Sequence, residues 1–292
     1  MKSRIIYALM TESGMDETEF IKQVRTFEEI KRMGFEAAVV YKTLETHPQK
    51  EVSDHLLSKN DLETLEKFGF RTRVQPEGSL GVGSAIKDAI KFAYELSDSE
   101  QDVIVYIEPD KFGVVKDTIK IVEPILSGRA ELVIPRRSQR SFATYPKFQQ
   151  FTEKELGTPI WNKALGKETD LYFSVHAYSR KIAPIFFNYP GDTWTVHYSP
   201  ILLINPELID SSIIIDGYNF PKEDFQQEDG NREIQLYRCK QVRQCTIEPL
   251  KRLKRLSAPL NKLEKTILKL EDKIRKGSLS DKDLVKFPRY KS

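Results

Sequence analysis

Two carboxylates, Glu108 and Asp110, flank a proline directly after an apolar run at residues 103–107 (VIVYI). The run has the length and the β-branched composition of a buried strand. Mg²⁺ and Mn²⁺ prefer oxygen ligands, and a metal-bound nucleotide commonly shares its ion with one or two protein carboxylates. Because proline restricts the backbone between them, the two acids can face one ion. The pattern predicts a divalent metal site, and a solvated Pro-Asp turn is the alternative.

A glycine-rich stretch lies upstream, where Gly81 and Gly83 lead into the apolar spacing of a helix. The first amides of such a helix can face a phosphate or a sugar. The stretch is not a dinucleotide fingerprint, because Ile86 stands at the third glycine position, and it lacks the Gly-Lys-Ser/Thr of a phosphate loop. Glycines that only turn the chain are the alternative.

A third candidate is the basic cluster that comes after another apolar run at residues 131–135 (ELVIP) and comprises Arg136, Arg137 and Arg140. Guanidinium groups form bidentate hydrogen bonds with diphosphates and carboxylates. The cluster therefore suits recognition of an acidic ligand, and a solvated basic loop is the alternative.

Apolar periodicity predicts the elements that position these residues. Short β-rich runs alternate with helical patterns, and they occupy residues 4–9, 36–41, 70–74, 103–107 and 131–135. This alternation predicts an α/β fold with a mostly parallel, Rossmann-like sheet flanked by helices. Ligands of such sheets bind beyond the carboxyl ends of the strands, where Glu108 and Asp110 are expected.

Three finer expectations concern later elements. The fourth helical pattern directs Ile119, Val122, Ile125 and Leu126 toward the core. Residues 211–217 and 233–246 are predicted to be strands, and the second of these contains Cys239 and Cys245.

Composition indicates a soluble globular protein. The chain has 292 residues with 39% hydrophobic and 30% charged residues, and no apolar run approaches the roughly 20 residues that span a bilayer. The first apolar run is short and is interrupted at Thr11, so a signal peptide is not expected. Two cysteines without nearby histidines are neither a disulfide framework nor a metal site. The expected location is cytoplasmic, with peripheral membrane contact as an option.

The basic charge is concentrated at the C-terminal end. Residues 248–292 contain 14 Lys and Arg against 6 Asp and Glu, whereas the rest of the chain is net negative. An apolar stripe at helical spacing comprises Leu260, Leu263, Ile267, Leu270 and Ile274. The expected division is a domain at residues 1–247 and a basic helical tail at 248–292. Three roles are open for the stripe: docking on its own domain, pairing with another copy as a homo-oligomer, and lying on an anionic membrane. Nucleic-acid binding is not favoured, because no recognised module is present.

The order of the three candidate motifs resembles that of GT-A fold glycosyltransferases of family 2, in particular dolichyl-phosphate mannose synthase-like members. Their order is a G-x-G-x-A helix start, a strand ending in D-x-D, a helix, and an A-D-h-V-h-G-S-R strand and loop, where h is apolar. The corresponding segments are residues 81–85 (GVGSA), 108–110 (EPD) and 129–137 (RAELVIPRR). Residues 169–181 (TDLYFSVHAYSRK) resemble the family's later Asp and Arg-Lys segment, and the resemblance spans about residues 70–182.

The resemblance implies roles for these residues. Glu108 and Asp110 would hold Mg²⁺ or Mn²⁺ against the diphosphate of a UDP- or GDP-linked sugar. A donor-binding role would extend to Gly81, Gly83, Ser84, Arg136 and Arg137. Asp170 would have an acceptor-side or catalytic role.

Two further candidates lie in residues 191–200 (GDTWTVHYSP). Some retaining GT-A enzymes use a late histidine as a third metal ligand, which suggests His197, and Asp192 is a second catalytic candidate. Packing among aromatic residues is the alternative for the histidine.

Three functions are compatible with these patterns. The first is a metal-dependent glycosyltransferase with an unidentified acceptor. The second is a nucleotidyltransferase of related fold, which would be favoured by a basic glycine-rich loop after the first strand, whereas residues 11–17 (TESGMDE) are acidic. The third is an inactive GT-A-like binding or scaffold protein, suggested because the second strand ends in Tyr41-Lys42-Thr43 and not in the acids that contact the base.

Overall fold

A computed structural model describes residues 3–11, 17–42, 59–76, 79, 81–216, 218–220, 230–254 and 256–286. The acidic stretch at residues 12–16 and Thr43 lie outside the described residues. Contacts divide the chain into two compact units: unit 1 is Met1–Pro135 with Ser174–Tyr218, and unit 2 is Arg136–Phe173 with Asn219–Ser292. The boundary expected between residues 247 and 248 falls inside unit 2, within a continuous helical run. The structure therefore divides the chain at other places.

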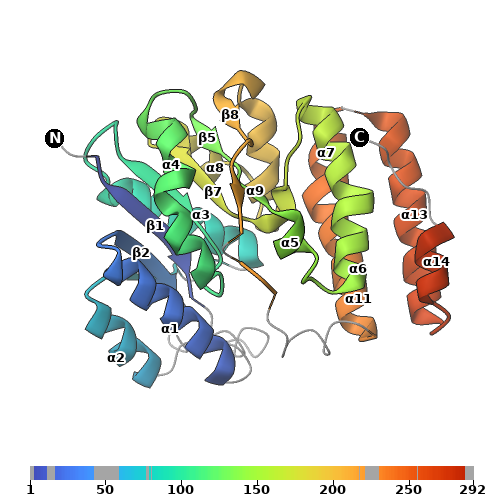
Figure 1. Ribbon diagram of the computed structural model, residues 1–292, viewed down its shortest axis with the longest axis horizontal. Helices are drawn as coiled ribbons and strands as arrows, with labels where there is room; N and C mark the ends of the chain where they lie inside the picture. Colours follow the sequence, from blue (N-terminus) through green and yellow to red (C-terminus); the bar gives the residue numbers. More distant parts are fainter. Residues whose placement is uncertain are drawn as a thin grey trace. The chain divides into compact units, whose positions relative to one another are not determined.

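Unit 1 is built on a mixed sheet of seven strands within the described residues (Figure 1). In spatial order they are β3 (Arg71–Val74), β2 (Glu36–Tyr41), β1 (Ile5–Met10), β4 (Val103–Tyr106), β7 (His176–Ser179), β5 (Leu132–Val133) and β8 (Ile209–Asp210). The first four are mutually parallel, and β7 runs antiparallel to both β4 and β5. The predicted α/β fold with a mostly parallel sheet is confirmed.

Helices cover both faces of this sheet. One face carries α1 (Glu17–Arg32), α2 (Lys59–Phe68) and α4 (Thr118–Leu126), and the other carries α3 (Gly81–Leu96) and α8 (Ala183–Phe187) (Figure 1). All four residues of β4 are fully buried. Strands covered on both faces are apolar throughout, which is why they appear in the sequence as continuous apolar runs.

Short elements complete unit 1. They are the 3₁₀ helix η2 (Phe112–Asp117), α9 (Thr195–Tyr198), η5 (Ser199–Leu203), η6 (Pro206–Leu208) and β9 (Ile214–Ile215). Strand structure in the predicted 211–217 segment is thus confined to β9 among the described residues.

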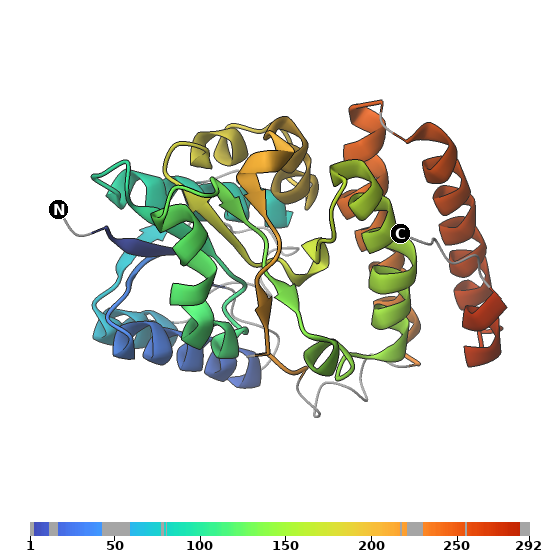
Figure 2. The same cartoon turned by 45° about the horizontal axis from the view of Figure 1, so that its top comes forward.

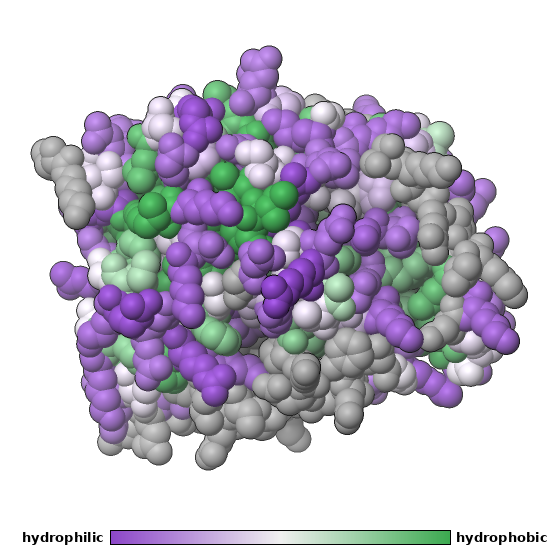
Figure 3. Space-filling model, viewed as in Figure 1, coloured by the Kyte–Doolittle hydropathy of each residue, from purple (hydrophilic) through white to green (hydrophobic). Residues whose placement is uncertain are grey.

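The exposed side of α4 differs from the expectation. Ile121 and Val122 are fully buried, whereas Ile119 is 53% and Leu126 43% exposed. Because Lys120 Nζ donates to Ile214 O at 2.6 Å, β9 lies beside this exposed side. The space-filling view shows apolar residues gathered in the region that α4 covers (Figure 3). The helix therefore has apolar residues on both its buried and its exposed side, which is why periodicity placed Ile119 and Leu126 in the core.

Among the residues of unit 2 that the structure describes, the regular elements are helical apart from β6 (Arg136–Arg137). Its elements are α5 (Gln139–Phe142), α6 (Lys147–Gln150), the π-helical turn η3 (Phe151–Gly157), α7 (Thr158–Leu165), η4 (Leu171–Phe173), α11 (Arg232–Val242), the π-helical turn η7 (Arg243–Ile247), α12 (Glu248–Arg252), α13 (Ser257–Arg275) and α14 (Asp281–Lys286).

The predicted strand at residues 233–246 is wrong, since this segment is α11 and η7. The Asn231 side chain caps the helix by accepting from the Glu233 and Ile234 amides, at 3.0 and 3.3 Å. An asparagine in this position favours a helix start. Both cysteines are buried in this helical run with free thiols.

The amphipathic helix predicted at the C-terminal end is α13. The five residues of its apolar stripe are all buried, and the helix packs against α11 and η7 within unit 2 (Figure 2). Of the three expected roles, docking on its own chain is the one observed. The stripe is therefore not free to pair with another copy or to enter a membrane. Within the described residues, no helix combines the length and apolarity needed to cross a bilayer.

Packing of α13 predicts a large difference between two neighbouring leucines. Leu270 is fully buried and Leu268 is 51% exposed. Truncating a buried leucine removes transfer free energy and leaves a cavity, so Leu270→Ala should lower the free energy of unfolding by about 2–5 kcal/mol. The matched control Leu268→Ala should change it by no more than about 0.5 kcal/mol. Urea unfolding measures both, and equal effects would contradict the observed packing.

Candidate functional site

The candidate site lies at the point in the sheet where the order of the strands reverses. From β1 the chain proceeds outward to β2 and β3, and then returns to the other side of β1 to form β4. In open α/β sheets the ligand crevice lies beyond the carboxyl ends of the strands at such a switch point. Glu108 and Asp110 come directly after β4, and so occupy this position in unit 1.

A tight turn brings three charged side chains together. The Lys111 amide donates to Glu108 O at 3.1 Å, which closes a turn that begins at Glu108 and carries Pro109 at its second position. Proline is favoured there because its φ is already suited to the turn. The Lys111 ammonium forms an ion pair with the Glu108 carboxylate and lies 3.9 Å from Asp110 Oδ1.

Exposure differs strongly among these groups. The Lys111 side chain is 8% exposed, Glu108 25% and Asp110 45%. Asp110 Oδ2 also accepts from the Tyr218 hydroxyl at 3.2 Å. Asp110 is thus the carboxylate that presents most surface to a ligand, while Lys111 is packed beneath it.

This arrangement does not fit the divalent metal that the resemblance implies. An ammonium already contacts Glu108, and two unit charges 4 Å apart interact by about 4 kcal/mol at an effective dielectric constant of 20, so its repulsion of a divalent ion, about 8 kcal/mol, would cancel the attraction of one of the two carboxylates. Within the described residues, no cluster of three or more His, Cys, Asp or Glu side chains could hold a metal ion. The predicted third ligand, His197, does not join the two carboxylates.

His197 instead forms a buried stack with His176. The two rings lie 4.1 Å apart and are nearly parallel, at 9°, and both residues are fully buried. The Tyr178 hydroxyl lies 3.2 Å from His176 Nδ1 and 3.5 Å from His197 Nδ1. In the part of the chain that is described, neither Nε2 atom has a hydrogen-bond partner.

Both imidazoles are neutral at pH 7. Burial lowers the pKa of His176 to about 3. Burial, the neighbouring His176 and the Lys111 ammonium lower the pKa of His197 well below its ordinary value. The ring of Tyr106, the last residue of β4, lies 4.8 Å from that of His197. The stack is therefore an uncharged layer under the end of β4.

The glycines at the start of α3 allow another backbone segment to approach. The Gly83 amide donates to Asp192 O at 2.8 Å, and a Cβ at position 83 would lie 2.3 Å from the Asp192 carbonyl carbon. Gly81 has φ of 82°, which favours glycine, and its Cβ would lie 2.7 Å from Asp192 O. Asp192 itself is exposed, and Ser84 is half-buried. The structure thus brings together Gly81, Gly83, Ser84 and the backbone of Asp192, and the Gly83 amide bonds to the protein itself.

Arg137 and Asp170 belong to unit 2, where they form a buried ion-pair network. The guanidinium of Arg137 is 1% exposed, and its Nε and Nη2 donate to the two oxygens of Asp170 at 2.7 and 2.6 Å. Its Nη2 also donates to Glu153 at 2.7 Å. The guanidinium carbon lies 4.4 and 4.5 Å from the ring centroids of Phe142 and Tyr145. The positive charge of Arg137 is therefore neutralised by carboxylates within unit 2, which suits a structural role.

Arg136 points to a less buried environment. Its side chain is 23% exposed, and its Nη1 pairs with Glu168, whose side chain is 75% exposed. Of the two adjacent arginines, Arg136 is therefore the one that keeps contact with solvent.

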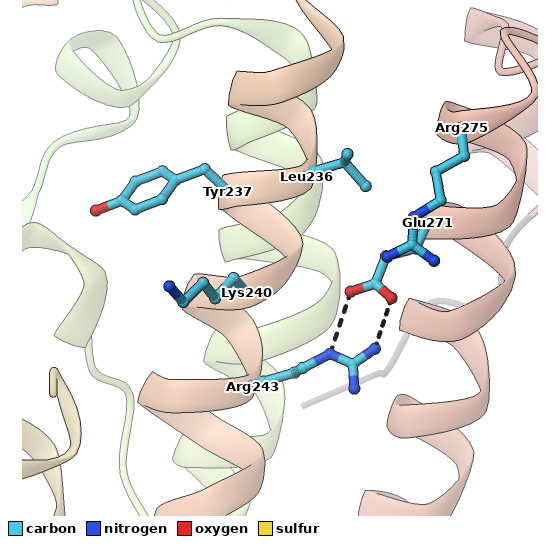
Figure 4. Close-up of a pocket in the computed structure, with 6 residues that line it drawn as sticks. All are labelled: Leu236, Tyr237, Lys240, Arg243, Glu271 and Arg275. Atoms are coloured by element: carbon cyan, nitrogen blue, oxygen red, sulfur yellow. Dashed lines mark hydrogen bonds and ion pairs between the residues drawn. The ribbon is translucent and has the colours of Figure 1, made fainter. Parts of the chain in front are cut away.

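Unit 2 also has a surface groove that the sequence did not indicate (Figure 4). Its volume is about 360 Å³, and it lies between α11 and α13 with Leu236, Tyr237, Lys240, Arg243, Glu271 and Arg275 as its lining. Arg243 donates to both oxygens of Glu271, at 3.2 and 2.7 Å. None of the residues expected to bind a ligand lines this groove.

Three residues of the site in unit 1 were missed from the sequence. Lys111 is adjacent to Asp110, and its role depends on the turn that closes at Glu108. His176 stands opposite Tyr106 in the antiparallel β4–β7 pair, which the strand–helix alternation did not predict. Tyr218 reaches Asp110 from more than one hundred residues away, and no sequence signal links the two.

No protein-family model matches the chain, and no curated protein sequence matches it. One similar solved structure is CMP:2-keto-3-deoxy-manno-octonic acid synthetase complexed with CTP. The TM-score is 0.46 at 9% sequence identity, and the match covers 82% of this chain and 98% of that one. The α/β fold is evident from the strands and helices of the chain itself.

The arginine network predicts that Asp170 matters for stability. Removing one partner of a buried ion pair leaves an uncompensated charge, so Asp170→Asn and Arg137→Met should each lower the free energy of unfolding by about 3–5 kcal/mol. The control Arg136→Met breaks a more exposed pair and should cost about 1 kcal/mol or less. Urea unfolding of the three variants checks this. Unchanged stability of Asp170→Asn would contradict the structural role and return Asp170 to the catalytic candidates.

The histidine stack predicts a loss of stability in mild acid. Both folded pKa values lie below the unfolded value of about 6.5, so the stabilisation is fully present above that pH and is lost as the pH falls toward the folded values. Between about pH 6.5 and 5 the unfolded chain gains up to two more protons, which corresponds to a slope approaching about 2.7 kcal/mol per pH unit. Unfolding free energies at pH 7.5, 6.5, 5.8 and 5.2 measure the slope. The variant with both His176→Gln and His197→Gln should lose most of it, and an unchanged slope would show that other groups cause it.

Proposed function

We propose that this chain is a transferase that acts on a nucleotide sugar, moving the sugar to an acceptor. The observation that supports it is the carboxylate pair Glu108 and Asp110 at the carboxyl end of β4, at the switch point of a sheet with order 3-2-1-4. This is the place where doubly wound α/β folds bind nucleotides. The order of the glycine-rich helix start and the acid-x-acid strand end in the sequence supports the same activity.

The geometry suggests which groups meet the donor. Asp110 is the most exposed carboxylate of the turn, and carboxylates accept hydrogen bonds from sugar and ribose hydroxyls. Tyr218 and Lys111 fix the position of that carboxylate through its two oxygens. Asp192 is exposed beside the start of α3 and is the candidate for an acceptor-side base. Because a metal does not fit the arrangement around Lys111, no step is assigned to one.

Ligand-induced stabilisation tests the proposal. Melting temperatures are measured with UDP, GDP, CMP, their common sugar conjugates and the nucleoside triphosphates, each in EDTA and in Mn²⁺. A ligand that binds only the folded state adds about 2.7 kcal/mol at one hundred times its Kd, so one nucleotide sugar should raise the melting temperature clearly. Asp110→Asn should lower the apparent affinity for that ligand at least tenfold, and the increase in melting temperature should shrink accordingly. The control Glu100→Gln, which changes an exposed carboxylate paired with Arg180, should not.

The same samples separate the alternatives. Release of the nucleoside diphosphate from a UDP- or GDP-linked sugar, or of CMP from a CMP-linked sugar, with water or a sugar as acceptor, supports glycosyl transfer. A triphosphate that binds best and releases pyrophosphate would instead assign nucleotidyl transfer. Binding without turnover would support the inactive binding protein, and no stabilisation by any nucleotide in either buffer would contradict the proposal as a whole.

A further inference from the structure

We infer that the ammonium of Lys111, and not a divalent metal ion, is the cation of the Glu108–Asp110 site. Ligand binding at the end of β4 is then independent of divalent metals. Metal exclusion rests on the geometry of the turn alone, whereas its consequence for nucleotide sugars rests on the proposed function.

The first support is that the ammonium is built into the turn. The 3.1 Å hydrogen bond from the Lys111 amide to Glu108 O places the first and fourth residues of the turn next to each other. Lys111 O then accepts from the Val114 amide at 3.0 Å as η2 begins. The backbone at both sides of Lys111 is thus fixed, and its ammonium is directed to Glu108.

The second support is burial. The Lys111 side chain is 8% exposed, so it is not a surface lysine that moves freely through solvent. Exposed lysine pairs are weak because two long side chains lose freedom when they meet. Here packing has already restricted the lysine, and the ion pair with Glu108 costs little further entropy.

The third support is that a displaced ammonium would lack a favourable place to move to. A metal bound by Glu108 and Asp110 would have to push the ammonium away from both carboxylates. The buried groups close to it include His197, which is neutral and stacks on His176. A buried cation that has lost its carboxylate partners is strongly unfavourable. Metal binding would therefore be opposed both by direct repulsion and by the cost of displacing Lys111.

Manganese titration monitored by electron paramagnetic resonance tests metal exclusion without any nucleotide. Free Mn²⁺ gives a signal that is lost on binding, so the affinity of each variant is read directly. Wild type, Lys111→Arg and Lys116→Met should bind Mn²⁺ weakly. Lys116 is the matched control, since it is an exposed lysine on η2. Lys111→Met, which keeps an unbranched side chain one atom shorter and removes the charge, should bind at least tenfold more tightly.

A second substitution locates the ion. Asp110→Asn in the Lys111→Met background should remove the gain in affinity, which places the new metal at this pair. Tight Mn²⁺ binding by the wild type that Asp110→Asn abolishes would overturn the inference, and this arm remains decisive if Lys111→Met fails to fold. Equal, weak binding by the wild type and a folded Lys111→Met would also overturn it, because the ammonium would then not be the group that excludes the metal.

The nucleotide measurements separate this inference from the proposed function. A nucleotide sugar that raises the melting temperature equally in EDTA and in Mn²⁺ supports both. Stabilisation that requires Mn²⁺ overturns the metal independence and leaves the transferase proposal in place. If no nucleotide stabilises the chain, the transferase proposal fails, and the manganese titration alone decides whether Lys111 excludes metals.

Discussion

Burial of the neighbouring strands β1 and β4, in which only Ile5 is half-buried, is the constraint on which the site in unit 1 depends. Helices cover β1 and β4 on both faces, so a polar side chain within either strand would be cut off from water. Charged groups can therefore stand only where these strands end. The turn after β4 is such an end, and it carries Glu108, Asp110 and Lys111 within four residues.

Each unit contains a buried cation between two carboxylates, Lys111 in unit 1 and Arg137 in unit 2, and solvent exposure gives the two clusters different roles. Arg137 is 1% exposed between Asp170 and Glu153, and aromatic rings cover its faces. No surface of that guanidinium remains for a ligand. The turn after β4 has the same composition, but Asp110 is 45% exposed. The cluster in unit 1 can therefore meet a ligand, while the cluster in unit 2 stabilises its own helices.

Sequence patterns predicted the features that continuous burial produces and missed those that long-range packing produces. The apolar runs that became β1, β2 and β4 were recognisable because both faces of the sheet are covered. The segment containing Cys239 was assigned to a strand because its apolar residues were considered without the Asn231 cap. The pairing of His176 with Tyr106 and the contact of Tyr218 with Asp110 join residues distant in sequence, so local periodicity carries no signal for them. The glycine-rich helix start was recognised, but the close approach of the Asp192 backbone explains Gly83 without any ligand.

The glutamate at position 108, where the D-x-D pattern that the turn resembles has an aspartate, has a physical role in this structure. An aspartate at position 108 would have a side chain one methylene shorter, whereas the glutamate carboxylate meets the Lys111 ammonium across the turn. Asp110 has the shorter side chain and remains 3.9 Å from the same ammonium while it exposes its carboxylate. The two acids are thus not equivalent. Glu108 neutralises the lysine, and Asp110 is exposed where the proposed ligand would bind, so the longer residue and the adjacent lysine form a single arrangement.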